Sequence, residues 1–121
     1  MKLLTPRGLT PRTHGAVDYL ACAGMFWLPG ALGLPEKTRR ASQLAALSYL
    51  GVAALTDYPL ALRRVIPFRV HGQTELLSVP LLALMPRLLD ANTRERQYWH
   101  ALAGLVSVAY LGTDWKADPD E

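Results

Sequence analysis

The chain has 121 residues, which is about one domain and too short for a catalytic domain plus a separate membrane anchor. Half of its residues are apolar and only 19% are charged, below the roughly 25% usual in soluble domains. The net charge of +3 comes from Lys and Arg residues in connecting segments, not along one helix face, so nucleic acid is not an expected partner. The single cysteine, Cys22, excludes an intrachain disulfide and a zinc site built from cysteines.

Four segments are nearly free of charge and predict four hydrophobic helices, at residues 15–34, 41–58, 72–89 and 98–115. Each has about 18 to 20 residues, close to the roughly 20 that a helix needs to cross a bilayer. A soluble amphipathic helix of this length would show a polar residue about once per turn on one side. We therefore expect a transmembrane four-helix bundle that forms a single membrane domain over residues 1–121. A soluble four-helix bundle is the alternative, and the low mean hydropathy of +0.10 favours it.

A shift of 57 residues aligns the second half of the chain with the first half without a gap. The matched pairs include His14-Gly15 with His71-Gly72, Asp18 with Glu75, Pro29 with Pro86, and Thr56-Asp57 with Thr113-Asp114. This pattern predicts a tandem duplication of a two-helix hairpin, with repeats at about residues 7–58 and 64–115. Because each unit has an even number of spans, we expect parallel repeats related by a pseudo-twofold axis along the membrane normal.

The four hydrophobic segments also predict where the protein is located and what it contacts. We expect a multi-pass protein of the inner (plasma) membrane, with the lipid bilayer as its partner and a homo-oligomer as a further option. A slight excess of Lys and Arg on the side of the two termini favours a cytoplasmic location for both ends.

Three stretches carry a resemblance to a known family: HGAVDYLACAGMFWLPGALGL, its counterpart HGQTELLSVPLLALMPRLL, and the linker LTDYPLALRRVIPFRVHG. They resemble the small bacterial membrane proteins of the SPW-repeat type over roughly residues 13–115. In that family each repeat is a pair of transmembrane helices with a Pro-Trp-containing motif late in the first helix. The segments 28–30 and 85–87 keep the proline but lack the serine and tryptophan of the motif. The resemblance implies the repeated hairpin architecture and brings no known activity.

Six polar side chains are predicted to lie on one side of the membrane: His14, Asp18, Asp57, His71, Glu75 and Asp114. His14 with Asp18, and His71 with Glu75, are i,i+4 pairs, so each pair points from one helix face. Two histidines with several carboxylates form the ligand set of a bundle-type di-metal site suited to iron, manganese or zinc, although the usual Glu-x-x-His spacing is absent. The ligand candidates are His14, Asp18, His71 and Glu75. A haem held between the two histidines is a second option.

A structural role for the same residues needs fewer assumptions. Carboxylates in the first turn of a helix offset the positive end of its dipole. Four arginines lie near in sequence and on the same side: Arg7, Arg12, Arg64 and Arg69. A network of Arg, Asp and His would tie the two repeats together. We therefore favour a non-enzymatic structural or interaction module without a cofactor, and keep a membrane metal- or haem-binding protein as the alternative.

Overall fold

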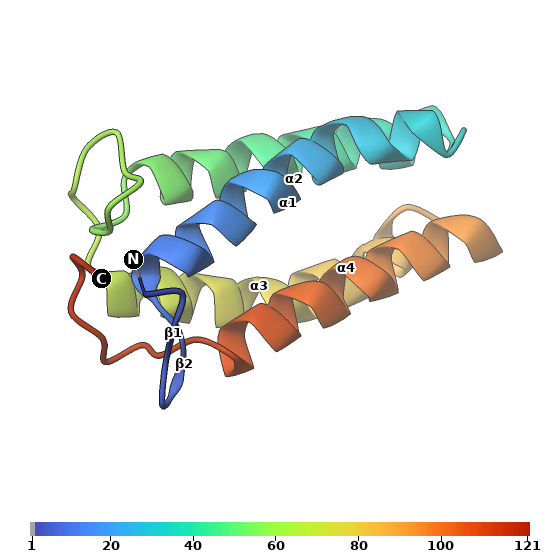
Figure 1. Cartoon of the computed structure of the whole chain (residues 1–121). Helices are drawn as coiled ribbons and strands as arrows, with labels where there is room; N and C mark the ends of the chain where they lie inside the picture. Colours follow the sequence, from blue (N-terminus) through green and yellow to red (C-terminus); the bar gives the residue numbers. More distant parts are fainter. Residues whose placement is uncertain (1) are drawn as a thin grey trace.

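Four long helices make up the computed structural model, which describes residues 2–121. They are α1 (Pro11–Ala31), α2 (Glu36–Ala54), α3 (Phe68–Leu88) and α4 (Thr93–Leu111). Helix α1 packs on α2 and α3 packs on α4, and the two hairpins lie on each other as two layers (Figure 1). The four-helix, all-α bundle of two hairpins that the sequence predicts is thus confirmed.

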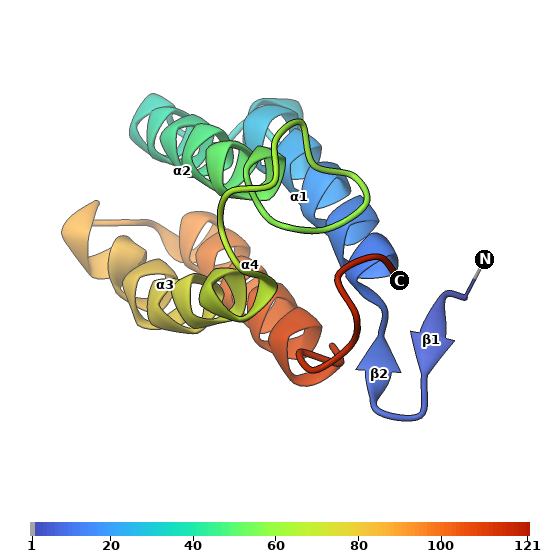
Figure 2. The same ribbon diagram turned by 90° about the vertical axis from the view of Figure 1, so that its left-hand side faces the viewer.

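A short β-hairpin that the sequence did not predict precedes α1. It pairs β1 (Leu4–Thr5) with β2 (Gly8–Leu9) in antiparallel register. The backbone N–H of Leu9 donates to the carbonyl of Gly112 at 2.7 Å, so the hairpin docks on the end of α4. Figure 2 shows both termini and the linker between the helical hairpins at this end of the bundle, whereas the two short turns lie at the other end.

The two short turns use the same backbone geometry, 57 residues apart. Gly33 after α1 and Asp90 after α3 have positive φ angles of 67° and 48°, which is the usual way to end a helix. The N–H groups of Leu34 and Ala91 then donate to a carbonyl five residues earlier, at 3.0 and 2.9 Å. Both hairpins therefore close through the same left-handed turn.

The prediction that each helix spans a membrane is not supported by the structure. Within residues 2–121, none of the helices is both long enough and apolar enough to cross a bilayer. The difference arises where the helices begin and end. Helices α2 and α4 include the charged segments 36–40 and 93–97, which the charge pattern assigned to turns, and they end before residues 58 and 115. Each of these helices thus has charged residues in its first turns and fewer apolar ones at its end.

The core fills the middle of the bundle, and a smaller cluster fills the end near the termini. Met25, Leu82 and Trp99 are among the buried residues of the main cluster. Ala53, Tyr58 and Phe68 form the smaller one. This second cluster lies beside the polar site described next, because the rings of Tyr58 and Phe68 pack against its histidines.

The outer surface of the bundle is also rich in large apolar side chains. Leu20, Leu44, Leu77 and Val108, one from each helix, are all more than 65% exposed: 74%, 68%, 76% and 68%. An exposed apolar surface of this extent is unusual for a protein that functions alone in water.

Candidate metal site

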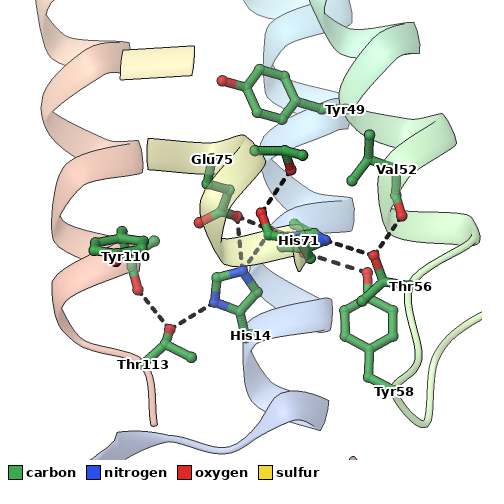
Figure 3. Close-up of polar contacts among 12 residues, drawn as sticks. His14, Tyr49, Val52, Thr56, Tyr58, His71, Glu75, Tyr110 and Thr113 are labelled. Atoms are coloured by element: carbon green, nitrogen blue, oxygen red, sulfur yellow. Dashed lines mark hydrogen bonds and ion pairs between the residues drawn. The ribbon is translucent and has the colours of Figure 1, made fainter. Parts of the chain in front are cut away.

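Four side chains from α1 and α3 meet at the end of the bundle that carries the termini (Figure 3). The Nε2 atom of His14 lies 2.8 Å from Glu75 Oε1 and 3.2 Å from Asp18 Oδ1. The Nε2 atom of His71 lies 3.0 Å from Glu75 Oε1 and 3.1 Å from Asp18 Oδ2. Each imidazole therefore faces one carboxylate on its own helix and one on the other helix. The four ligand atoms all lie within 4.8 Å of one another.

Three of the four side chains are almost fully buried, and the fourth, Asp18, has a side chain that is 12% exposed. His14, His71 and Glu75 are 0%, 2% and 5% exposed. The Trp115 ring lies over His14, with its centroid 4.9 Å from that of the imidazole, and the Tyr58 ring lies 5.9 Å from His71. Burial under aromatic rings strengthens every charge interaction within the site, because the local dielectric is low.

Two threonines hold the outer nitrogens of the imidazoles. His14 Nδ1 lies 2.7 Å from Thr113 Oγ1, and His71 Nδ1 lies 2.6 Å from Thr56 Oγ1. Each hydroxyl donates its one hydrogen to the backbone carbonyl four residues earlier, at 2.6 Å in both cases. The threonine oxygen must therefore accept from the imidazole, so Nδ1 carries a hydrogen and Nε2 is the atom that faces the carboxylates.

These contacts interlock the two helical hairpins. Thr56 follows α2 in the first hairpin and binds His71 of the second, whereas Thr113 follows α4 in the second hairpin and binds His14 of the first. The two contacts are related by the same offset of 57 residues that relates the sequence halves. Each imidazole is thus held between the two hairpins.

Two glycines allow the aromatic rings of Tyr58 and Trp115 to pack close to the site. A Cβ atom added at Gly15 would lie 3.0 Å from the Tyr58 ring, and one added at Gly72 would lie 2.9 Å from the Trp115 ring. These glycines each follow a site histidine directly. A side chain at either position would push the ring away from the imidazole that it covers.

The two halves of the site differ at one hydrogen bond. The Tyr58 hydroxyl donates to Asp18 Oδ2 at 3.3 Å. The matched residue, Trp115, donates its Nε1–H to the Tyr110 carbonyl at 2.8 Å instead. Within residues 2–121, Glu75 Oε2 is consequently buried without any hydrogen-bond partner. A buried polar atom without a partner costs about 1–3 kcal/mol, so such an atom calls for an explanation.

The carboxylates and the imidazoles shift each other's pKa. Burial alone would lower the pKa of His14, but hydrogen bonds and charges from Asp18 and Glu75 outweigh it and raise the pKa to about 9. The pKa of His71 is raised against the same effect of burial and by the same two carboxylates. Burial would raise the pKa of Asp18, yet hydrogen bonds from both imidazoles lower it to about 2. Without a metal, the site therefore holds a protonated His14 beside an ionised Asp18 at neutral pH.

The other predicted site residues lie outside this cluster. Asp57 is on the surface, 3.4 Å from Arg64, and Asp114 accepts a hydrogen bond from Thr5 at 2.7 Å. Within the described chain, no hydrogen bond or ion pair joins the cluster to any of the predicted arginines: Arg7, Arg12, Arg64 and Arg69. The predicted network of Arg, Asp and His is thus replaced by one of His, Asp, Glu and Thr.

The sequence contained a signal for the threonines that our prediction did not use. The repeat pairs Thr56-Asp57 with Thr113-Asp114, and we assigned the functional role to the aspartates. Each threonine comes within two residues of the end of its helix, close enough to bond back to the last turn and still reach a histidine. The neighbouring aspartate points elsewhere.

A second buried carboxylate at the other end of the bundle differs from Glu75 in having partners. Glu95 accepts a hydrogen bond from the Thr38 hydroxyl and one from the Asn92 backbone N–H at 2.9 Å. Glu95 is 1% exposed. It has no histidine beside it, so it provides an internal comparison for Glu75.

The space beside the cluster limits which cofactors fit. A cavity of about 30 Å³ adjoins Asp18, His71 and Glu75. That is room for about one water molecule and far too little for a porphyrin. The site therefore suits a single metal ion better than the haem that we considered from the sequence.

No protein-family model, curated protein or solved structure matches this chain. The resemblance to the SPW-repeat type accordingly stays a prediction.

Proposed function

We propose that the protein binds one divalent transition-metal ion between His14, Asp18, His71 and Glu75. The observation that carries this proposal is the convergence of four ligand atoms, two nitrogens and two carboxylate oxygens, within 4.8 Å of one another in a buried site. In a tetrahedral site with bonds of about 2.0–2.1 Å, the ligand atoms lie roughly 3.3 Å apart. The four distances from histidine to carboxylate here are 2.8–3.2 Å, close to that spacing.

The threonine contacts support the proposal. A histidine that ligates a metal usually donates its other ring N–H to a fixed acceptor, which sets the tautomer and the ring orientation. Thr113 and Thr56 serve as these acceptors for His14 and His71, at 2.7 and 2.6 Å. Both Nε2 lone pairs are thereby available at the centre of the cluster once their protons leave.

Charge balance also supports a divalent ion. Two protonated imidazoles and two carboxylates are neutral in sum, and two neutral imidazoles, two carboxylates and a divalent ion are neutral as well. One metal ion can therefore replace two protons without leaving a net charge in a buried site, where an unbalanced charge costs several kcal/mol. Imidazole and carboxylate ligands suit iron, manganese, cobalt and zinc.

A titration of the chelator-stripped protein with Co(II) and Zn(II) tests the proposal. The expected result is one ion per chain, and loss of binding when His14→Ala and His71→Ala are combined. The sharper comparison is Glu75→Gln against Glu95→Gln, because both residues are buried glutamates but only Glu75 adjoins the histidines. Glu75→Gln should weaken binding by about 10-fold to 100-fold or more, whereas Glu95→Gln should leave it unchanged.

Two outcomes would overturn the proposal. A folded wild-type protein that takes up no metal would leave the cluster with only a structural role, as a hydrogen-bonded network of His, Asp, Glu and Thr between the two hairpins. Equal metal binding by Glu75→Gln and Glu95→Gln would place the ion elsewhere.

The membrane location, the cytoplasmic termini and the lipid or homo-oligomer partners predicted from the sequence stay predictions. Their support is the exposed apolar surface that includes Leu20, Leu44, Leu77 and Val108. Fractionation of cells into membrane and aqueous fractions tests the location. Recovery of the protein in the aqueous fraction, without detergent and as a single species, would contradict it.

A further inference from the structure

We propose that the metal ion has an open coordination position, which holds water at rest and accepts an uncharged diatomic molecule such as nitric oxide or dioxygen. This inference rests on the proposed metal site and goes beyond it. It distinguishes a site that binds an exogenous ligand from a purely structural one, whose metal is fully ligated by protein.

The first observation is the cavity itself. Its volume is about 30 Å³, which exceeds the roughly 10–15 Å³ that one water molecule needs. Asp18, His71 and Glu75 line its polar side, and apolar residues of α1 and α4, including Met25 and Val106, line the rest. Three of the four proposed ligands therefore border one small space.

The second observation is the unpartnered oxygen of Glu75. Glu75 Oε1 contacts both imidazoles, and Oε2 has no partner within residues 2–121. Figure 3 shows the oxygen that makes no contact on the side of Glu75 that faces α4. Helix α4 contributes Leu105, Val106 and Ala109 to the wall of the cavity. A water molecule on the metal, placed in this cavity, would donate a hydrogen bond to Oε2 and so give the buried oxygen its partner.

The walls decide which ligands fit. Beyond the carboxylates and His71, the cavity is lined by apolar side chains and the Tyr49 ring. A second anion beside two carboxylates would meet both repulsion and a cost of burial, so an uncharged ligand is favoured. The volume limits that ligand to about the size of one water or one diatomic molecule.

Two grooves border the cavity, and they differ in whether proposed ligands line them. A groove of about 390 Å³ between α2 and α3 is lined by His71, Glu75 and Tyr49, all of which also line the cavity. The matched groove between α1 and α4, of about 410 Å³, includes none of the four proposed ligands, although it shares apolar residues such as Ala21 and Met25 with the cavity. Tyr49, whose hydroxyl donates to Ser78, thus lies between the outer groove and the cavity. The cavity therefore borders both grooves, and the α2–α3 groove is the one of the two that reaches His71 and Glu75.

The test uses the full-length protein loaded with Fe(II) under anaerobic conditions and exposed to nitric oxide. The expected result is one nitric oxide per iron, seen as the EPR signal of a high-spin iron–nitrosyl. Ala109→Leu should fill the cavity without changing a ligand, so iron should still bind one to one while the nitrosyl signal falls by about tenfold or more. Ala101→Leu, on the same helix but outside the cavity, is the matched control and should bind nitric oxide as the wild type does.

The remaining outcomes separate a failure of the open position from a failure of the metal site. Stoichiometric iron without a nitrosyl in the wild type, or an undiminished nitrosyl in Ala109→Leu, would overturn the open position and leave the proposed metal site intact. Failure of the wild type to bind iron, cobalt or zinc would overturn both. If Ala109→Leu does not fold, Ala109→Val applies the same test with a smaller side chain, and a partial loss of the signal is then expected.

Discussion

Thr113 and His14 are 99 residues apart in the sequence, yet Thr113 Oγ1 lies 2.7 Å from His14 Nδ1. The contact joins the end of α4 to the beginning of α1. Its counterpart joins Thr56, after α2, to His71 on α3 at 2.6 Å. The imidazoles are therefore oriented by the opposite hairpin in each case, and the site exists only when both hairpins are in place.

Replacement of Thr113 by valine should weaken the fold and the metal site together. The change leaves the buried Nδ1–H of His14 without an acceptor, which costs about 1–3 kcal/mol of unfolding free energy. Metal affinity should fall by about 10-fold to 100-fold, because the ring loses its orienting partner. Chemical denaturation and Co(II) titration measure the two effects.

Thr74→Val is the control for this change, because within residues 2–121 the Thr74 hydroxyl bonds only to the backbone carbonyl of His71 on its own helix. It should alter metal affinity little. Equal losses of affinity in Thr74→Val and Thr113→Val would show that the contact with His14 does not orient the ring.

Glycine replacements should have opposite effects at two kinds of helical position. Gly72→Ala should destabilise the protein by about 1–3 kcal/mol, because its Cβ would lie 2.9 Å from the Trp115 ring. Gly24→Ala and Gly104→Ala should each stabilise it by up to about 1 kcal/mol, because nothing lies within 4 Å of the added Cβ and alanine is the better helix former. Thermal or urea denaturation gives the sign. A stabilised Gly72→Ala protein would contradict the close packing of Trp115 on α3.

The metal-free protein should lose stability in alkali. The pKa of His14 is raised from 6.5 to about 9, so its contribution is fully present below pH 6.5 and is lost as the pH rises through 9. At about 1.4 kcal/mol per pKa unit, this change is on the order of 3 kcal/mol, shared with the residues to which His14 is bonded. Urea denaturation of the metal-free protein, in the presence of a chelator and between pH 6 and 10, measures this loss of stability. His14→Gln should flatten this dependence, and a wild-type curve that is already flat would contradict the raised pKa.

In acid, the stability of the metal-free protein should change in the opposite direction and fall as the pH is lowered. The pKa of Asp18 is lowered from 3.8 to about 2, so its contribution is present above pH 3.8 and is lost as the pH falls through 2. Asp18→Asn removes the negative charge that both imidazoles face, and should therefore lower the stability of the metal-free protein at neutral pH. An unchanged midpoint of denaturation near pH 7 would show that this ion pair does not stabilise the fold.

Metal binding near pH 7 should release at least about one proton per ion. The pKa of His14 is raised to about 9, so this imidazole is protonated in the metal-free protein, whereas a metal ligand needs a free Nε2 lone pair. The pKa of His71 is raised as well, which adds to the proton release. Calorimetric titrations in two buffers of different ionisation enthalpy count the protons. Binding without proton release would mean that the imidazoles are neutral before the metal arrives.

Local patterns in the sequence were enough to predict the helices and their pairing. Charge-free segments separated by proline and arginine predict four helices, and short turns between them require hairpins. The i,i+4 spacing also places His14 with Asp18, and His71 with Glu75, on common helix faces. These features depend on neighbours in the chain, which the sequence displays directly.

The helix boundaries were harder to predict, for a physical reason. Charged residues at positions 36–40 and 93–97 indicate a turn when only charge is considered, yet Glu, Lys and Arg are good helix formers. A capping box between Asn92 and Glu95 begins α4 ahead of its charged first turn. The prediction of membrane spans assumed that these two helices begin at residues 41 and 98, after the charged segments, whereas they begin at Glu36 and Thr93.

Only the tertiary structure decided which polar residues form the site. The sequence placed six polar residues at the same end of the bundle and gave no reason to separate them. Asp57 and Asp114, however, lie beyond the ends of α2 and α4. Asp57 contacts Arg64, and Asp114 accepts a hydrogen bond from Thr5. The sequence by itself determined the repeat, the hairpins and the two His-carboxylate pairs. The threonine contacts, the unpartnered Glu75 oxygen and the cavity depend on how one hairpin packs against the other, which no local pattern encodes.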